Sequence, residues 1–163
     1  MQSANFTTME SILIREATQD DIPTLLRFEQ GVIRAERPFD TTLKPGDDTR
    51  YYNLDLMLDA PHIHLVVAEF DGQPIASGYA RIEDAKPFVQ HKQHAYLGFM
   101  FVEPAHRGKG INKLVIDELK KWSKDKGIHE LRLDVYFENT PAIAAYEKVG
   151  FTKHMIEMRT ALN

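Results

Sequence analysis

The stretch that decides the fold is Val102-Glu103-Pro104-Ala105-His106-Arg107-Gly108-Lys109-Gly110-Ile111-Asn112-Lys113-Leu114. An apolar run ends where it begins, a turn with two glycines follows, and a helical pattern starts directly after the turn. The first turn of an α-helix has backbone N–H groups without intrahelical partners, and the helix dipole places partial positive charge there. Gly108 and Gly110 allow an anion to approach this backbone, and Arg107, Lys109 and Lys113 add full charges. The pattern predicts a phosphate-binding loop.

Two common nucleotide-binding motifs do not fit this loop. A Walker-type loop needs a glycine five residues before its Gly-Lys pair and a hydroxyl residue after it, but Glu103 and Gly110 occupy those positions. A dinucleotide fingerprint needs a third glycine where Lys113 stands. These mismatches argue against a kinase or another nucleotide-binding protein.

A second segment, Leu131 to Phe151, has the pattern of a strand followed by a short helix. Residues 131–137 alternate in polarity, and Glu138-Asn139-Thr140-Pro141 is typical of a turn that leads into a helix. Asn139 and Tyr146 are seven residues apart, which is about two helical turns, so both are expected to face the same way.

Together, the two segments resemble the coenzyme A-binding motifs of the GNAT superfamily of N-acetyltransferases. The pyrophosphate loop of that superfamily reads Arg or Gln, two residues, Gly, one residue, then Gly or Ala. Residues 107–112 follow this order, except that Asn112 stands at the last position. The superfamily also has an Asn after the fifth strand and a Tyr seven residues later that faces the cofactor sulfur, and Asn139 and Tyr146 have this spacing.

The resemblance covers residues 11–162 and implies that acetyl-CoA is the co-substrate. It assigns cofactor binding to Phe101, Val102, Arg107, Gly108, Lys109, Gly110, Ile111, Asn112, Lys113, Asn139 and Tyr146. It further implies that the fourth strand bulges away from the fifth around residues 100–102, and Gly98 would ease such a bulge. The implied reaction transfers acetyl to a primary amine of a small molecule or peptide by direct attack in a ternary complex. The alternative is a non-catalytic acyl-CoA-binding sensor.

Two residues are the expected catalytic groups. Tyr146 is the candidate general acid, because a phenol can protonate a leaving thiolate. Asp134 is the candidate base, since related ribosomal-protein alanine acetyltransferases have a catalytic Glu at the matching place. The rival bases are Glu83, Asp84, His91 and His94.

In this superfamily the first two helices and their connection shape the acceptor pocket, which here corresponds to Gly31–Leu58. This region contains Arg34, Glu36, Arg37, Asp40, Asp47, Asp48, Tyr51 and Tyr52. Its acids would favour a cationic amine, whereas Arg34 and Arg37 would suit the carboxylate of an amino acid. Both acceptor classes remain open.

The predicted fold is α/β (α+β), with a mixed, mostly antiparallel sheet of about six to seven strands, about four flanking helices, and splayed strands four and five. Strands are expected at residues 12–17, 63–70, 74–82, 96–102, 131–137 and 153–161. Helices are expected to begin near Thr18 and to cover residues 54–58, about 109–126, and the surroundings of 142–146. Residues 1–10 are expected to be a frayed lead-in, and 11–162 a single domain.

Composition excludes several functional classes. The 24 acidic and 20 basic residues give a net charge of −4, which argues against general affinity for nucleic acids or membranes. Cysteine is absent, so disulfides and thiolate chemistry are excluded. The seven histidines, including His62 and His64, form no spaced metal motif, so no metal is expected. A signal peptide or membrane span is not visible, and a cytoplasmic location is expected. A homodimer is left open.

Overall fold

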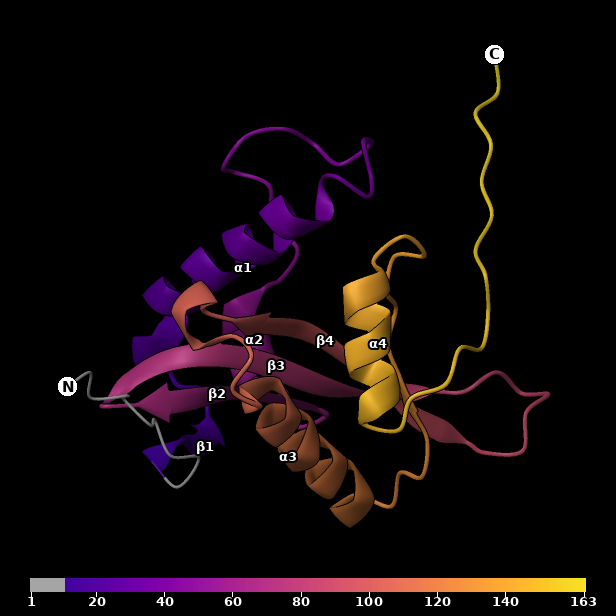
Figure 1. The fold of residues 1–163 in the computed structure, drawn as a ribbon. Helices are drawn as coiled ribbons and strands as arrows, with labels where there is room; N and C mark the ends of the chain where they lie inside the picture. Colours follow the sequence, from indigo (N-terminus) through magenta and orange to yellow (C-terminus); the bar gives the residue numbers. More distant parts are fainter. Residues whose placement is uncertain (1–10) are drawn as a thin grey trace.

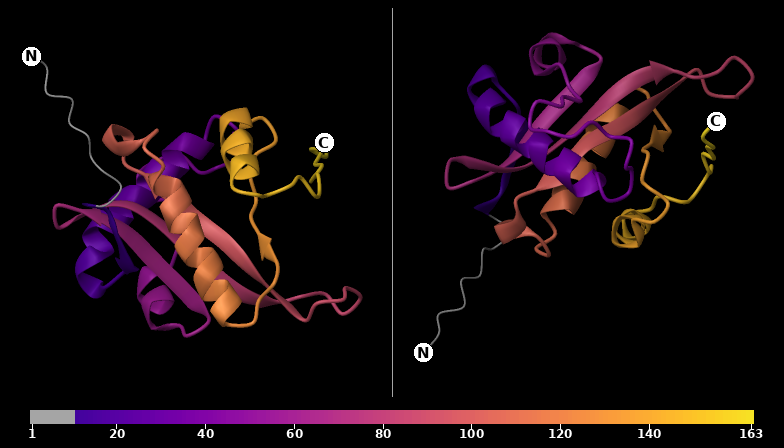
Figure 2. Two further views of the ribbon diagram at one scale, coloured as in Figure 1. Left: turned by 60° about the horizontal axis from the view of Figure 1, so that its bottom comes forward. Right: turned by 90° about the horizontal axis from the view of Figure 1, so that it is seen from above.

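A computed structural model describes residues 11–163; the lead-in expected over residues 1–10 lies outside them. The described part forms a five-stranded sheet with helices on both faces (Figures 1 and 2). In chain order the elements are β1 (Leu13–Glu16), a 3₁₀ turn (Gln19–Asp21), α1 (Ile22–Glu36), α2 (Leu54–Asp59), β2 (Ile63–Phe70), β3 (Gln73–Asp84), β4 (Gln93–Val102), a 3₁₀ turn (Pro104–His106), α3 (Ile111–Asp125), β5 (Leu131–Arg132) and α4 (Thr140–Lys148).

The sheet is mixed and mostly antiparallel, as predicted. Its order is β1-β2-β3-β4-β5, and the first four strands pair antiparallel with their neighbours. β5 returns through α3 and pairs parallel to β4 over only two residue pairs, Ala95 with Leu131 and Tyr96 with Arg132. Beyond these pairs the two strands no longer share a ladder, which agrees with the predicted splay.

Two hydrophobic cores, one on each face, hold the helices against the sheet. Alternation along β2 supplies both, because successive side chains of a strand point to opposite faces. Val66 and Ala68 pack with α3 residues such as Val115, whereas Leu65 and Val67 pack with α1 and α2. The views in Figure 2 show α1 and α3 on opposite sides of the sheet.

One strand prediction was wrong, and another gave a strand that is too long. Residues 153–161 have no strand pairing in the structure, and residues 152–163 are all exposed. Only Leu131 and Arg132 of the expected strand 131–137 pair with a neighbour. The sheet therefore has five strands within residues 11–163 rather than six or seven. Residues with alternating polarity form a strand only where a partner edge is within reach. Within residues 11–163, segment 153–161 finds no such edge, and segment 131–137 finds one only for its first two residues.

Within residues 11–163, none of the helices combines the length and the hydropathy that a membrane span requires.

Candidate active site

The loop between β4 and α3 adopts the backbone that an anion-binding site needs. Gly108 and Gly110 have φ angles of +75° and +77°, in the left-handed region that favours glycine. A Cβ added at Gly108 would meet no atom within 4 Å, so this glycine is required by the backbone and leaves open space beside it. Gly110 caps α3 without a side-chain hydrogen bond. The first turn of α3 thus presents N–H groups to the space in front of the loop.

The basic side chains of the loop have different tasks. Arg107 Nε donates to the carbonyl of Val102 at 2.9 Å, and its guanidinium lies 5.7 Å from the centre of the Phe101 ring, so it ties the loop to the end of β4. Lys109 is exposed, and Lys113 pairs with Asp117 at 2.6 Å on the surface of α3.

Two further loop residues follow the geometry of α3. The Ile111 side chain is buried in the core under the helix, so only its backbone can face a ligand. Asn112 is half-buried in the first turn.

A bulge in β4 lies next to this loop, as the sequence predicted. The pairing with β3 shifts from Tyr79 with Gly98 to Ser77 with Phe101, so β4 has one extra residue here. Phe99 has a φ of +56°, which is rare for a residue with a large side chain. The buried Ser77 hydroxyl donates to the Phe99 carbonyl at 2.9 Å and holds this backbone in place.

The bulge also changes the face of the sheet to which alternate side chains of β4 point. Leu97 packs in the core on the α3 side, whereas Phe99 packs in the core on the α1 side. Phe101 then lies against Phe28 of α1, with ring centres 4.8 Å apart. A Cβ at Gly31 would come within 2.5 Å of the Phe101 ring, so this glycine permits the close packing. Side chains of the bulged segment are engaged in packing, and its backbone faces the gap where β4 and β5 part.

Asn139 and Tyr146 belong to α4, on the other side of that gap. The Asn139 side chain accepts a hydrogen bond from the Ala142 N–H at 3.3 Å and so caps the helix. The Tyr146 ring packs edge-on against Phe151, 5.9 Å between centres. Burial, and next the negative charge of Glu36, raise the pKa of Tyr146 above its ordinary value of 10.0. Its phenol therefore keeps its proton at neutral pH.

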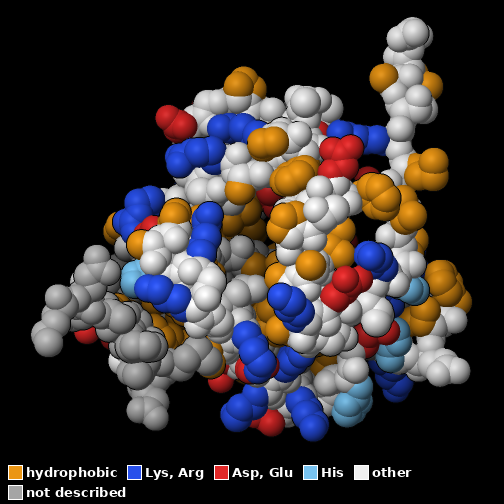
Figure 3. Space-filling model, viewed as in Figure 1, with side chains coloured by type: hydrophobic (Ala, Val, Ile, Leu, Met, Phe, Trp, Pro, Cys, Tyr) orange, Lys and Arg blue, Asp and Glu red, His pale blue; other side chains and the backbone are white. Residues whose placement is uncertain are grey.

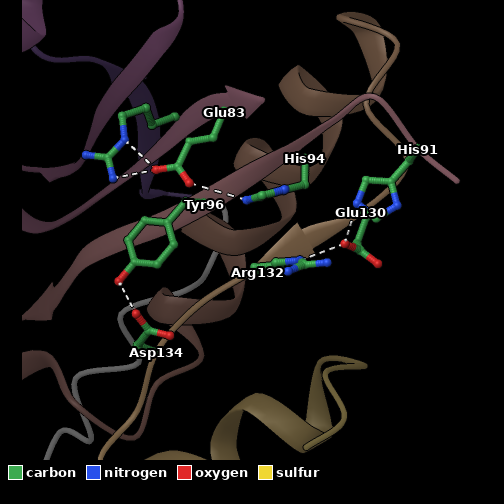
Figure 4. Close-up of polar contacts among 8 residues, drawn as sticks. Glu83, His91, His94, Tyr96, Glu130, Arg132 and Asp134 are labelled. Atoms are coloured by element: carbon green, nitrogen blue, oxygen red, sulfur yellow. Dashed lines mark hydrogen bonds and ion pairs between the residues drawn. The ribbon is translucent and has the colours of Figure 1, made fainter. Parts of the chain in front are cut away.

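Asp134 lies two residues beyond β5, where the two strands separate. Its exposed carboxylate accepts a hydrogen bond from the Tyr96 hydroxyl at 3.2 Å (Figure 4). Burial, and next the charge of Asp134, raise the pKa of Tyr96. The neighbouring Arg132 donates to Glu130 at 2.7 Å, so Asp134 is not its ion-pair partner.

The rival bases lie at the far end of β4. Glu83 binds Arg81 at 2.6 Å and His94 at 3.3 Å, and Asp84 accepts from Gln93 at 3.1 Å. His94 precedes Phe99 by five residues, which is about 17 Å along an extended strand. The structure thus separates Glu83, Asp84, His91 and His94 from the bulge and the loop.

A cluster of acids and tyrosines at the end of α1 was not anticipated as a unit. We call Glu36, Asp40, Tyr51, Tyr136 and Tyr146 the acidic–aromatic cluster. The Tyr51 hydroxyl donates to Glu36 at 2.8 Å, and the Tyr136 hydroxyl donates to Asp40 at 3.4 Å. Burial, and to a lesser degree the charge of Asp40, raise the pKa of Glu36. The sequence carries no signal for this meeting, because about a hundred residues separate the acids from Tyr136 and Tyr146.

Of the arginines in this region, Arg159 pairs with Asp40 of the cluster at 3.0 Å, whereas Arg37 and Arg34 do not contact the cluster's acids. Arg37 donates to the backbone carbonyls of Lys44, at 3.0 Å, and of Gly46, so it supports the loop after α1. Arg34 is exposed. In the space-filling view, a hollow with hydrophobic side chains in its walls lies between the segment leading into α3 and α4 (Figure 3).

Comparisons with known proteins agree with this geometry. The model of the acetyltransferase (GNAT) family matches residues 30–151. The chain is 29% identical over 151 residues to thialysine N-epsilon-acetyltransferase of Sus scrofa, covering 87% of this chain and 85% of that one. It is 30% identical over 118 residues to aminoglycoside N(6′)-acetyltransferase type 1 of Salmonella typhimurium, covering 67% and 77%.

A solved structure supports the assignment. The crystal structure of a predicted acetyltransferase with acetyl-CoA from Clostridium acetobutylicum matches with a TM-score of 0.68 and 25% identity, covering 91% of this chain and 96% of that one. The chain therefore belongs to the GNAT family of acetyltransferases and is an acyltransferase whose co-substrate is acetyl-CoA.

Proposed function

We propose that this chain transfers acetyl to the primary amine of a small cationic molecule by direct attack in a ternary complex. The observation that carries the proposal is the acidic–aromatic cluster, in which the Glu36 and Asp40 carboxylates accept hydrogen bonds from the Tyr51 and Tyr136 hydroxyls. Carboxylates beside aromatic rings attract ammonium groups. The Arg37 guanidinium, which would suit an acceptor carboxylate, is engaged with the loop backbone.

The described residues fit acetyl-CoA. The loop from Arg107 to Lys113 offers backbone N–H groups, two left-handed glycines and three basic side chains for a pyrophosphate. The backbone at Phe101 and Val102 is assigned to the pantetheine arm, and Asn139 to the region near the thioester. Acetyl-CoA supplies an already activated acyl group, so the chain's main task is to bring an amine to it in the correct orientation.

Two side chains, Tyr146 and Asp134, transfer the protons in the proposed reaction. Tyr146 donates a proton to the leaving thiolate, and its raised pKa keeps that proton in place before the reaction. A primary amine with an ordinary pKa near 10.4 arrives protonated and must lose a proton before it can attack. We assign Asp134 as the base that accepts this proton. The Tyr96 hydroxyl donates a hydrogen bond to Asp134 and orients its carboxylate.

The relatives are consistent with a cationic acceptor. Their names describe acetylation of thialysine and of aminoglycosides, both of which are amines that carry positive charge at neutral pH. Because this chain has the same fold and an acidic acceptor region, we extend this class of cationic acceptors to it. The cytoplasmic location expected from the sequence stays a prediction.

The test is a thiol-release assay with acetyl-CoA and a matched panel of acceptors. We expect release with thialysine, lysine and an aminoglycoside, and at least tenfold lower kcat/KM with an amino acid whose only amine is next to its carboxylate. A preference for the second class would contradict the cationic assignment. Tight acetyl-CoA binding without release for any amine would instead support the sensor function.

We also propose that the chain forms a homodimer through its C-terminal segment, residues 152–163. Within this exposed segment, Met155, Ile156, Met158 and Leu162 are 70–91% exposed. β5, which ends the sheet on this side, is an edge strand. A second copy would cover these side chains and supply backbone partners to the extended segment.

A further inference from the structure

Three potential metal ligands meet at the end of the sheet that is remote from the cofactor loop. They are His91 in the loop before β4, His94 in β4, and Glu130 directly before β5 (Figure 4). One ligand atom from each residue lies within 4.8 Å of the other two. The parallel start of β4 and β5 brings them together, because the Ala95 N–H donates to the Glu130 carbonyl at 3.0 Å. The sequence did not predict this group, since Glu130 is 36 residues from His94.

The imidazole nitrogens that face this group are buried and lack hydrogen bonds. His94 is only 8% exposed, and its Nδ1 makes no hydrogen bond within residues 11–163. His91 Nε2 is also buried; it lies 3.0 Å from Glu130 Oε2, but the orientation of the ring does not allow a hydrogen bond. Buried polar atoms without partners are uncommon and call for a ligand.

We propose that His91, His94 and Glu130 bind a divalent transition-metal ion of the zinc class. Two imidazoles and one carboxylate form a common three-residue ligand set for Zn²⁺, with water as the fourth ligand. The Glu130–His91 contact of 3.0 Å is already near the ligand–ligand spacing that a coordination bond of about 2.0–2.2 Å requires. His94 reaches the site by a small movement of its ring.

Neighbouring charges prepare the ligands. His94 Nε2 lies 3.3 Å from Glu83 Oε2, so this carboxylate holds the Nε2 proton and leaves the Nδ1 lone pair for a metal. Arg81 fixes Glu83 from the other side through two hydrogen bonds of 2.6 and 2.9 Å. Arg132 Nε donates to Glu130 Oε2 at 2.7 Å and fixes the position of this carboxylate.

The location assigns the ion a structural role. It would join the loop of residues 85–92 to β4 and β5, about 17 Å along β4 from the bulge at Phe99. Binding to the folded state stabilises it by mass action. The inference is independent of the proposed acetyl transfer, because none of its residues belongs to the loop, the bulge or the acidic–aromatic cluster.

Titration of the metal-free full-length chain, prepared without a histidine tag, tests the site. We expect Zn²⁺ to bind with 1:1 stoichiometry in competition with a chromogenic chelator. We expect Co²⁺ to give the visible absorption of a tetrahedral nitrogen and oxygen site. His94→Ala and Glu130→Gln should each weaken Zn²⁺ binding at least tenfold, and Glu83→Gln should weaken it by a smaller factor. His62→Ala, at an exposed histidine outside the group, is the matched control and should bind like the parent.

The same proteins allow a second readout. Zn²⁺ should raise the melting temperature of the parent and of His62→Ala but not of Glu130→Gln, whose half-exposed side chain can be changed without disturbing a core. Equal Zn²⁺ affinity of Glu130→Gln, His94→Ala and the parent would overturn the proposal, as would the absence of 1:1 binding at micromolar Zn²⁺. If His94→Ala does not fold, Glu130→Gln and the Co²⁺ spectrum decide alone.

Discussion

At the scale of single residues, the phenol of Tyr146 is the group expected to affect turnover most directly. Replacing Tyr146 by Phe keeps the packing against Phe151 and removes only the proton donor. We expect kcat to fall by roughly tenfold to a hundredfold, with the KM for acetyl-CoA within about twofold of the parent. Steady-state kinetics measure both. Tyr79→Phe, which alters a buried tyrosine of β3 outside the acceptor region, is the control. An unchanged kcat in Tyr146→Phe would assign the proton to another group.

Glu36 is the residue expected to select the acceptor. Glu36→Gln keeps the shape of the side chain and its contact with the Tyr51 hydroxyl but removes the charge. We expect the KM for a cationic acceptor to rise by about tenfold, as for the loss of one charge-assisted hydrogen bond, while the KM for acetyl-CoA stays constant. Asp20→Asn, at an exposed acid of the 3₁₀ turn before α1, should leave both constants unchanged. Equal effects of the two variants would indicate general attraction by surface charge.

The same carboxyl makes the stability of the fold depend on pH. Burial raises the pKa of Glu36 in the folded state above its ordinary value of 4.5, so the folded state binds this proton more tightly than the unfolded chain does. The resulting stabilisation is complete below the ordinary value and is lost as the pH rises through the raised pKa. Urea unfolding should show that Glu36→Gln lacks this loss of stability as the pH rises above about 4.5, the ordinary value of the carboxyl. Parallel curves for both proteins would contradict the assignment.

At the scale of elements, the role of Gly108 in cofactor binding can be distinguished from its role in the backbone of the turn between β4 and α3. Gly108 and Gly127 both have left-handed φ angles, +75° and +78°, and an added Cβ meets no atom within 4 Å at either. Gly108→Ala and Gly127→Ala should therefore lose similar stability, about 1 kcal/mol each. Only Gly108→Ala should raise the KM for acetyl-CoA, by at least fivefold, because only that Cβ lies beside the expected pyrophosphate. A similar KM for acetyl-CoA in both variants would show that the loop is not part of the cofactor site.

At the scale of the whole molecule, local sequence patterns predicted most of the helices and strands. The remaining features depend on contacts between residues far apart in the sequence, which these patterns do not predict. The turn at Asp71–Gly72 and the helix after Gly110 depend on neighbouring residues and were predicted, whereas the bulge in β4 was implied by the family resemblance. The extent of α1 as far as Glu36 was not predicted, because residues 31–36 lack a clear period. The contact of Asp40 with Tyr136 depends on how the segment after α1 and the segment before α4 come together, and sequence spacing does not contain that information.

The C-terminal segment, residues 152–163, carries the last prediction. Its alternating pattern predicts a strand, yet it pairs with no strand of residues 11–163. The ion pair of Arg159 with Asp40, at 3.0 Å, connects it to the loop after α1. Exposed apolar side chains on an extended backbone favour pairing with another copy. Light scattering should give twice the chain mass for the intact protein and the single-chain mass for a variant that ends at Thr152.

Two point variants distinguish a specific role of this segment in the dimer from a general effect of losing exposed apolar surface. Met158→Lys, in the segment, should weaken the dimer by at least tenfold, because the charge would be buried at the contact. Phe88→Lys, at an equally exposed apolar residue of the β3–β4 loop, should leave the dimer intact. A monomeric parent chain, or a dimer that survives truncation at Thr152, would show that the segment has another role. Dissociation caused only by Phe88→Lys would transfer the contact to the β3–β4 loop.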